Sequence, residues 1–514
     1  MNASTASLLE DRKARIEERL QGDARLPRCY GKPVLQGRNI HYEVSARDRG
    51  VAIGGIGAMH LMARKLGLAR EIDARLGLLK LYLPYRDSDH VLNITYNALC
   101  GGTCLDDLEL LRNDEGYLDV LDAQRIPDPT TAGDFCRRFG AGHINALMDA
   151  ANEVRPRVWQ RQPRKFFEEA FIDGDGTMVP TSGQCKEGIG LSYDGQWGYH
   201  ALVISLANTQ EPLFIVNRGG NRPSQEGAAE YFDRAVALVR RAGFKEVTLR
   251  GDTDFSQSEH LDRWNADGVR FVFGYDAMKN MNEIAGSLPS SAWKLLVREP
   301  RYEPAAEPRE RPENVRDRIV AEREYKNLHL LKEEVAEFDY QPTKCSKAYR
   351  MVVLKKSISV ERGQLVLYPE VRYFFYITNR RDISITEVVR LANDRCNQEN
   401  LHAQLKGGVR ALRAPLDTLL SNWAYMVMTA MAWSMKAWFA LLLPVDGQGR
   451  ERREQEHEKR ALLRMEFRTF LNAIIRIPAQ IIRTGRRIVV RLMGWSRWLP
   501  TFFRGIDALR VRHH

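Results

Sequence analysis

Residues 419–443 form a long apolar stretch that limits the folds available to the whole chain. The stretch reads LLSNWAYMVMTAMAWSMKAWFALLL, which is long enough to span a membrane. It also carries Asn422, Ser434 and Lys436 and is rich in Met and Ala, which equally suits a helix buried in a large protein. No other part of the chain resembles a membrane protein, and the polar N-terminus lacks the pattern of a signal peptide. We therefore expect a buried helix in a cytoplasmic protein with no membrane contact.

The size and composition of the chain agree with this expectation. With 514 residues, 44% of them hydrophobic and 28% charged, the chain should form a soluble protein of roughly two to four domains. The seven cysteines show no paired spacing and no His or Cys partners at metal-site intervals. We expect reduced thiols rather than disulfides or a zinc site.

The pattern of apolar runs after residue 159 predicts a mixed sheet. Three runs, at 166–172, 199–206 and 212–216, are separated by turn residues. An expected helix (225–242), a run (246–249), a second helix (258–265) and a last run (269–275) follow in that order. This order predicts an α/β fold with helices covering a mixed sheet. Catalytic groups in such sheets tend to lie at strand ends, where Asp175 and Asp252 fall.

The region before residue 159 is predicted to be helical. An amphipathic helix pair is expected over 57–76, and a helix over 88–101 with Ser88 as a possible N-cap. Residues 118–121, a turn at 127–129 and a Thr-capped helix over 130–139 could form a helix-turn-helix that presents Arg137 and Arg138 to DNA. Any helical hairpin would show the same pattern, so this alternative stays open.

A β-rich insertion is expected after the predicted sheet. Pro300, Pro304, Pro308 and Pro312 mark a charged loop, and strands are expected at 349–354, 364–368 and 372–378 around a turn at 362–363. The interval from Asp252 to Glu399 is 147 residues, against 77 from Asp175 to Asp252. The predicted units are a helical DNA-binding region (1–160), the core's first part (161–276), a β-rich insertion (277–372), the core's second part (373–445) and a basic helical C-terminal region (446–514).

A predicted helix over 391–407 carries the third candidate carboxylate. Arg395, Glu399 and Lys406 are separated by four and seven residues, which places them along one helix face. A solvated face of mixed charge would show the same spacing. Together with Asp175 and Asp252, Glu399 could complete a three-carboxylate site for a divalent metal ion.

The positive charge of the chain is concentrated near its C-terminus. The net charge is +11, and from Lys459 onward thirteen Lys and Arg residues face two acidic ones. We expect a helix whose basic stripe contains Arg476, Arg483, Arg487 and Arg491, which is typical of nucleic-acid binding. A basic, solvated helix without a partner is the alternative.

Three segments together resemble a known family. The motifs DGDGT, RGDTDF and DRCNQENLHAQLKGG are similar to those of the DDE transposases of bacterial insertion sequences. The resemblance is to the branch with a Tyr-x2-Arg-x3-Glu-x6-Lys signature and an RNase H-like core interrupted by a β-rich insertion. Ala392 stands at the tyrosine position, which departs from the signature. The Asp-x-Thr pattern favours Asp175 over Asp173 as the first carboxylate.

The resemblance implies an activity, cofactors and partners. Asp175, Asp252 and Glu399 would hold two Mg²⁺ or Mn²⁺ ions about 3.5–4 Å apart. Arg395 and Lys406 would contact DNA near the cleaved end. The chain would bind terminal inverted repeats, act as a homodimer on DNA, and cut and join strands in cut-and-paste transposition. An inactive or nuclease-only relative is the alternative, and a glycosidase with two carboxylates gains no support from the basic C-terminal region.

Overall fold

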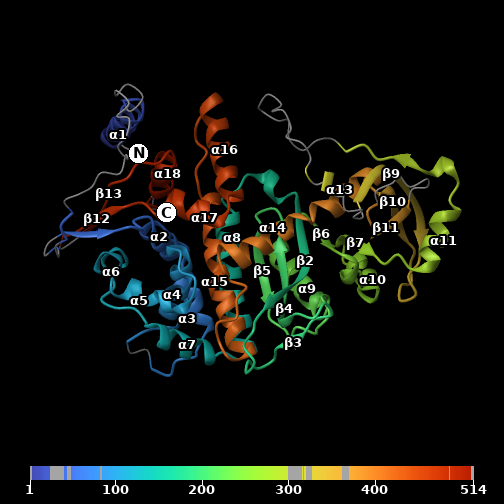
Figure 1. Cartoon of the computed structure of the whole chain (residues 1–514), viewed down its shortest axis with the longest axis horizontal. Helices are drawn as coiled ribbons and strands as arrows, with labels where there is room; N and C mark the ends of the chain where they lie inside the picture. The colour runs from blue at the N-terminus through green and yellow to red at the C-terminus, as the bar shows by residue number, and fades with distance from the viewer. Residues whose placement is uncertain are drawn as a thin grey trace.

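The computed structural model describes residues 3–22, 40–42, 45, 48–81, 84–298, 315, 318–319, 327–361, 370–484 and 487–510. The predicted loop at Pro300, Pro304, Pro308 and Pro312, and the predicted strand 364–368 with its turn at 362–363, lie outside these residues. Most helices gather on one side of the molecule, together with β12 and β13, whereas the large sheet lies on the other side with a few helices; both ends of the chain lie on the helix-rich side (Figure 1).

A ten-stranded mixed sheet forms the strand-rich side. Its first strands are β2 (Glu169–Pro180), β3 (Gly190–Leu191), β4 (Trp197–Leu206), β5 (Glu211–Val216), β6 (Glu246–Gly251) and β7 (Arg270–Tyr275). β4 runs antiparallel to β2, β3 and β5, whereas β6 is parallel to β2 and β7 is parallel to β6. The helices α9 (Ala228–Ala242) and α10 (Ser258–Ala266) precede the two parallel strands. The predicted RNase H-like mixed sheet with flanking helices is therefore confirmed.

Aromatic packing holds the helices on this sheet. The buried ring of Phe232 on α9 lies edge-on to Phe255 and Trp264, with ring centroids 6.1 and 5.9 Å apart. Gly174 of β2 faces the same ring, and a Cβ there would lie 2.4 Å from it. A larger residue at position 174 would therefore push α9 away from the sheet.

The β-rich segment extends the core sheet. It contains α11 (Lys279–Ser287), β8 (Lys294–Leu295), β9 (Asn327–Tyr340), β10 (Tyr349–Glu361) and β11 (Glu370–Thr378). β11 pairs antiparallel with β7, and β10, β9 and β8 follow outward. The strands predicted at 349–354 and 372–378 lie within β10 and β11. The insertion is thus continuous with the sheet that carries the candidate site.

The long apolar stretch forms α15 (Leu419–Leu441), which is buried along most of its length. It packs against β5, α4 (Asp87–Cys100), α8 (Ala141–Trp159) and α16 (Gly449–Arg464). Its indole groups find buried acceptors: Trp423 donates to the carbonyl of Ile215, and Trp438 donates to Glu211 at 2.7 Å. The prediction of a buried helix is confirmed, and none of the helices in the described residues is long and apolar enough to cross a membrane.

The N-terminal helices agree with the sequence except at their caps. The predicted pair is α2 (Ile56–Leu66) and α3 (Leu68–Arg75), joined at Gly67 with a φ of +74°. Ser88 is not the cap of α4. It lies inside the first turn of that helix, and its hydroxyl donates a hydrogen bond to Asp73. The predicted helical hairpin is α6 (Glu115–Leu121) and α7 (Pro129–Arg137). α7 is capped by Asp128 rather than by a threonine.

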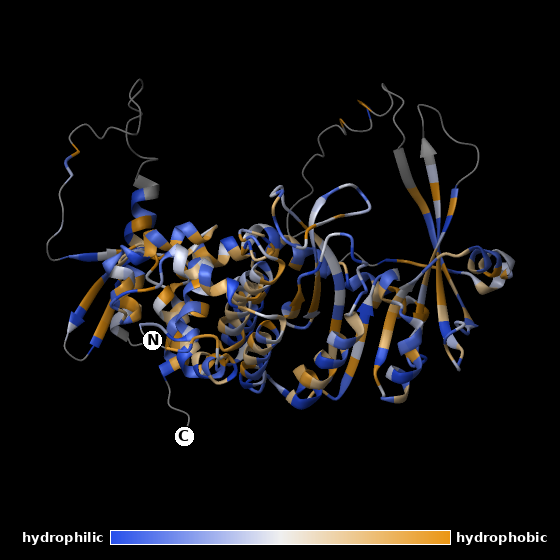
Figure 2. Ribbon diagram, turned by 90° about the horizontal axis from the view of Figure 1, so that it is seen from below, coloured by the Kyte–Doolittle hydropathy of each residue, from blue (hydrophilic) through white to orange (hydrophobic). Residues whose placement is uncertain are grey.

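The C-terminal region departs most from the sequence prediction. The expected basic helix is wrong beyond residue 478, where the chain forms a hairpin of β12 (Ala479–Thr484) and β13 (Arg487–Leu492). β1 (Arg49–Val51) completes a three-stranded sheet with it, and the hairpin carries both hydrophobic and hydrophilic residues (Figure 2). Further described helices include α1 (Ala3–Gly22), α5 (Leu108–Arg112), α17 (Phe467–Phe470) and α18 (Leu499–Arg510).

Candidate active site

Asp173 and Arg250 form a buried ion pair between β2 and β6. Arg250 donates from Nε to Oδ1 of Asp173 at 2.6 Å and from an Nη to Oδ2 at 2.9 Å. Both side chains are almost completely buried, and the guanidinium also donates to the carbonyl of Leu391 at 3.2 Å. Because both of its oxygens bind arginine, Asp173 is engaged as a structural carboxylate.

Asp175 lies two residues further along β2, on the same face of the strand. Its Oδ2 is 3.6 Å from an Nη of Arg395 and 3.7 Å from Nδ1 of His402. The pKa of Asp175 is raised to about 7, mainly by burial; the carboxylates of Asp252 and Glu399 contribute to this rise, and Arg395 opposes it. β2 continues to Pro180, so Asp175 lies inside a strand, which corrects the prediction of a strand end.

Asp252 directly follows β6, the parallel neighbour of β2. The last registered pair of these strands is Asp173 with Arg250, so Asp175 and Asp252 each lie two residues beyond that pair. The carboxylate of Asp252 accepts a hydrogen bond of 3.0 Å from the backbone N–H of Asp254. Burial raises the pKa of Asp252, and Arg395 opposes that rise. The strand-end position predicted for Asp252 is confirmed.

The predicted continuous helix over 391–407 is wrong. The chain forms α13 (Ile385–Asp394), α14 (Asn397–Ala403) and a π-helical turn, η5 (Gln404–Gly408). The break at Arg395 follows Asn393 and Asp394, two residues of low helix propensity. Single π-helical turns are often found at functional sites. Despite the break, Arg395 and Glu399 both act electrostatically on Asp175.

Gln398 fastens α14 to the sheet. Its buried Nε2 donates to the carbonyl of Val203 at 2.9 Å and to that of Asp173 at 3.3 Å. The next residue, Glu399, is exposed. The amide of Gln398 therefore links α14 to both β2 and β4, and this holds the neighbouring Glu399 at a fixed distance from the strand that carries Asp175.

Lys406 and His402 complete the surroundings of Asp175. Burial lowers the pKa of Lys406, and the nearby Asp175 opposes this effect. Burial, together with Lys406 and Arg395, lowers the pKa of His402 to about 3, so its imidazole is neutral at pH 7. Arg395 and Lys406 thus lie beside the carboxylate of Asp175.

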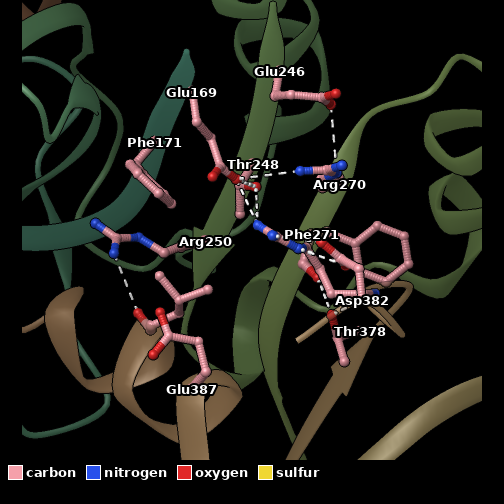
Figure 3. A network of polar contacts seen from close by, with 12 residues as sticks. Glu169, Phe171, Glu246, Thr248, Arg250, Arg270, Phe271, Thr378, Asp382 and Glu387 are labelled. Carbon is pink, nitrogen blue, oxygen red and sulfur yellow. Dashed lines mark hydrogen bonds and ion pairs between the residues drawn. The ribbon is translucent and has the colours of Figure 1, made fainter. Parts of the chain in front are cut away.

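A polar network at the opposite end of the parallel strands aligns the sheet (Figure 3). Glu169 of β2 accepts hydrogen bonds of 2.6 Å from Thr248 of β6 and from Arg380, which follows β11. The hydroxyl of Thr378 donates to the carbonyl of Phe271 at 2.6 Å, which joins β11 to β7. Through these bonds the extended sheet holds β2 and β6 in register below the two aspartates.

The chemistry of the three candidate carboxylates suits a hard divalent cation. Asp175, Asp252 and Glu399 offer only oxygen donors, which Mg²⁺ and Mn²⁺ prefer. A cation would oppose both the burial and the carboxylate repulsion that raise the pKa of Asp175. Within the part of the chain that the structure describes, no three His, Cys, Asp or Glu side chains are close enough to hold one ion together. The donors fit such an ion in kind, and coordination would bring them closer together.

The basic residues predicted to bind DNA lie in different surroundings. Arg137 pairs with Asp134 and with Asp417, both at 2.9 Å, whereas Arg138 is exposed. Arg483 pairs with Asp119 at 3.2 Å and Asp122 at 2.7 Å. Because alternate residues of a strand face opposite sides, Arg487 and Arg491 lie together on the exposed face of β13. They do not share a stripe with Arg476 and Arg483, as the helix prediction required.

The sequence reasoning missed three residues of this site: Arg250, Gln398 and His402. Each lies within a quoted motif, yet only the fold shows what it contacts. The departure at Ala392 also has a structural context, because Ala392 and Tyr376 of β11 pack against the same buried cluster. Tyr376, from another strand, thus packs against the same cluster as the residue at the tyrosine position of the signature.

The chain is similar to a known protein family and to solved structures. A family model described as transposase DDE domain group 1 matches residues 36–511, which include all three candidate carboxylates. Comparison with curated proteins gave no match. Among solved structures, the cryo-EM structure of the piggyBac transposase synaptic complex with hairpin DNA is similar with a TM-score of 0.37 and 8% identity. That match covers 83% of this chain and 84% of the other.

Proposed function

Because the chain belongs to the transposases of DDE domain group 1, we propose that it moves an insertion sequence by a cut-and-paste route. It binds the terminal inverted repeats, cleaves the DNA strands there and joins the released ends to target DNA. In cleavage, a water oxygen bonds to phosphorus and the bond to the 3′ oxygen breaks. In joining, the oxygen of the freed 3′-hydroxyl bonds to a phosphorus of the target strand, and the bond from that phosphorus to the target's 3′ oxygen breaks.

The observation that carries this proposal is that Asp175 and Asp252 each lie two residues beyond the last registered pair of β2 and β6, with Glu399 acting electrostatically on Asp175. The nearby Asp173 is already paired with Arg250, so Asp175 is the first carboxylate of the set. Burial is the main cause of the raised pKa of Asp175, and the carboxylates of Asp252 and Glu399 contribute to it, so a bound cation would favour the ionised form of this buried group.

These carboxylates would hold two Mg²⁺ or Mn²⁺ ions. Bound there, the ions would activate the attacking water or hydroxyl and stabilise charge on the leaving oxygen. The chain supplies the rest of the site: Arg395 and Lys406 balance charge beside the carboxylates and hold the phosphate backbone, and Gln398 keeps α14 at a fixed height above the sheet. Neutral His402 fills the space below Asp175 without adding a positive charge.

DNA binding outside the active site falls to exposed basic residues. Arg487 and Arg491 on the hairpin and Arg138 after α7 are exposed. Contacts from these side chains to phosphates position the DNA without reading its sequence. An element has two ends, and each copy of the chain contributes one candidate site, so we propose that a homodimer acts on the paired ends.

The direct test is incubation of the protein with DNA from the flanks of its own gene and Mg²⁺. Breaks at inverted repeats and strands joined to a target plasmid are expected. Asp175→Asn, Asp252→Asn and Glu399→Gln should each abolish both products and keep DNA binding. Asp254→Asn is the matched control, because Asp254 is an exposed carboxylate two residues from Asp252 and should be dispensable.

DNA breaks without joined products would indicate that the protein is a nuclease that does not join strands. An active Asp175→Asn variant, or an Asp254→Asn variant as inactive as Asp252→Asn, would contradict the assignment of the carboxylates. DNA binding without any cleavage in Mg²⁺ or Mn²⁺ would favour an inactive DNA-binding relative.

A further inference from the structure

A second cleft lies beyond the candidate active site, where β2 ends. Its volume is about 800 Å³, and most of its lining comes from the end of β2, the start of β4 and the segment that follows η5, with Thr103 and Tyr425 of α15 completing it. The lining residues that matter here are Thr181, Ser182, Trp197, Arg410 and Arg413. Because β2 also carries Asp175, the strand leads directly from the carboxylates to this cleft.

The cleft is positively charged. Arg410 and Arg413 line it, and no Asp or Glu is among its lining residues. Neither guanidinium forms a hydrogen bond or ion pair with another residue that the structure describes, unlike Arg137 and Arg483. Two unpaired guanidinium groups beside hydroxyl side chains suit phosphate oxygens.

The backbone presents one of these arginines at a conformational cost. Arg410 has a φ of +59°, a left-handed conformation that non-glycine residues seldom adopt. Hydrogen bonds on either side hold it there: Val409 donates to the carbonyl of Gln404 at 2.8 Å, and Leu412 donates to that of Leu405 at 3.1 Å. Strain of this kind is concentrated at functional sites. Both acceptors belong to η5, the turn that contains Lys406.

An exposed tryptophan forms the opposite wall. Trp197 opens β4 and pairs with Leu191 of β3, and 56% of its surface is exposed. Its backbone carbonyl accepts a hydrogen bond of 3.1 Å from Thr181, which ties it to the end of β2. The face of an indole can stack on any nucleic-acid base. The cleft therefore combines a stacking surface with two phosphate-binding groups.

We propose that this cleft binds an unpaired nucleotide of the DNA strand whose end lies in the active site. Its base stacks on Trp197, and Arg410 and Arg413 hold the adjoining phosphates. Pro180 lies five residues after Asp175 along β2, a distance of about 17 Å. Since the duplex spacing of about 3.4 Å per nucleotide is the shortest for an unstacked strand, the bound nucleotide would lie within about five positions of the cleaved phosphate. This inference rests on the proposed function for its DNA substrate.

The test measures binding in EDTA, where no strand is cut. The full-length protein is titrated with a blunt duplex and with the same duplex carrying a single-stranded extension, and 2-aminopurine is placed at successive positions of the extension. With the junction placed at the phosphate that would be cleaved, we expect tighter binding of the extended duplex and quenching greatest within about five nucleotides of that junction. Trp197→Ala should weaken binding of the extended duplex by roughly 5- to 150-fold, the range for base–aromatic stacking, and Trp197→Phe should retain most of it.

The arginines are tested by salt dependence. Arg410→Gly relieves the left-handed strain, so it should fold at least as well as the wild type, and Arg413→Gln keeps side-chain length. Each should lower the slope of log affinity against log salt by about 0.7–0.9. Lys245→Gln is the matched control. Lys245 is exposed and lies just before the start of β6, whereas Asp252 lies just after its end.

Equal affinity for the two duplexes, or slopes unchanged in both arginine variants, would overturn the cleft proposal. Failure of the proposed function is a separate result, because cleavage is measured in Mg²⁺ on the same proteins. Normal cleavage together with no preference for the extension would reject the cleft alone. A clear preference without any cleavage would reject the enzyme assignment alone.

Discussion

Replacing Asp175 with asparagine should stabilise the metal-free protein even though it removes activity. The pKa of this carboxyl is raised from 3.8 to about 7 in the folded chain, mainly by burial. Because the folded pKa lies above the unfolded one, the stability that the protonated group contributes is complete below about pH 4. It is lost as the pH rises to 7. At 1.36 kcal/mol per pKa unit, the ionised carboxylate costs about 4 kcal/mol at pH 8.

Asparagine does not titrate, so the advantage of Asp175→Asn should grow with pH. At pH 5 the wild type has lost only part of this stability, and the variant should gain about 2–3 kcal/mol more at pH 8 than at pH 5. The free energy of unfolding is measured by urea titration in EDTA at both pH values. Saturating Mg²⁺ at pH 8 should stabilise the wild type and have little effect on the variant.

Asp173→Asn is the matched control for this experiment. It leaves the buried guanidinium of Arg250 without its carboxylate, which costs about 3–5 kcal/mol. The two aspartates, two residues apart, should therefore respond in opposite directions. A destabilised Asp175→Asn together with a neutral Asp173→Asn would refute the reasoning and exchange their roles.

Three further predictions follow from buried and exposed polar groups. Burial lowers the pKa of Lys436 from 10.5 to about 7, so the cost of its charge is complete below pH 7 and vanishes as the pH approaches 10.5. Lys436→Met should therefore raise the free energy of unfolding by about 4 kcal/mol at pH 7 and by little at pH 10.5, as measured by chemical denaturation. Gln398→Ala should slow single-turnover cleavage by about 10²-fold with unchanged DNA affinity, and an unchanged rate would contradict its anchoring role. Arg487→Gln and Arg491→Gln should each lower the salt slope of DNA binding by about 0.9, whereas Arg483→Gln should weaken folding and leave the slope unchanged; identical slopes in all three would place the hairpin away from DNA.

The sequence predicted the sheet well because each strand is a short apolar run closed by turn residues. It could not choose firmly between Asp173 and Asp175. Residues two apart on a strand share a face, so the pattern treats them alike. The choice depends on the register between β2 and β6, which sets Arg250 opposite Asp173. That register is a tertiary property, fixed in part by the bond between Glu169 and Thr248 at the far end of the strands.

The failed prediction of a C-terminal helix shows what charge spacing can and cannot indicate. An interval of four residues fits a helix face, but it also fits one face of a strand, because alternate residues of a strand share a face; Arg487 and Arg491 are related in this way on β13. The β-branched residues between them, including Ile481, Ile482 and Val489, favour a strand over a helix. The change of element alters the electrostatics: Arg483 turns inward to Asp119, and Arg487 stays exposed on the opposite face. The net charge of this region therefore overstates the number of arginines that it can offer to DNA.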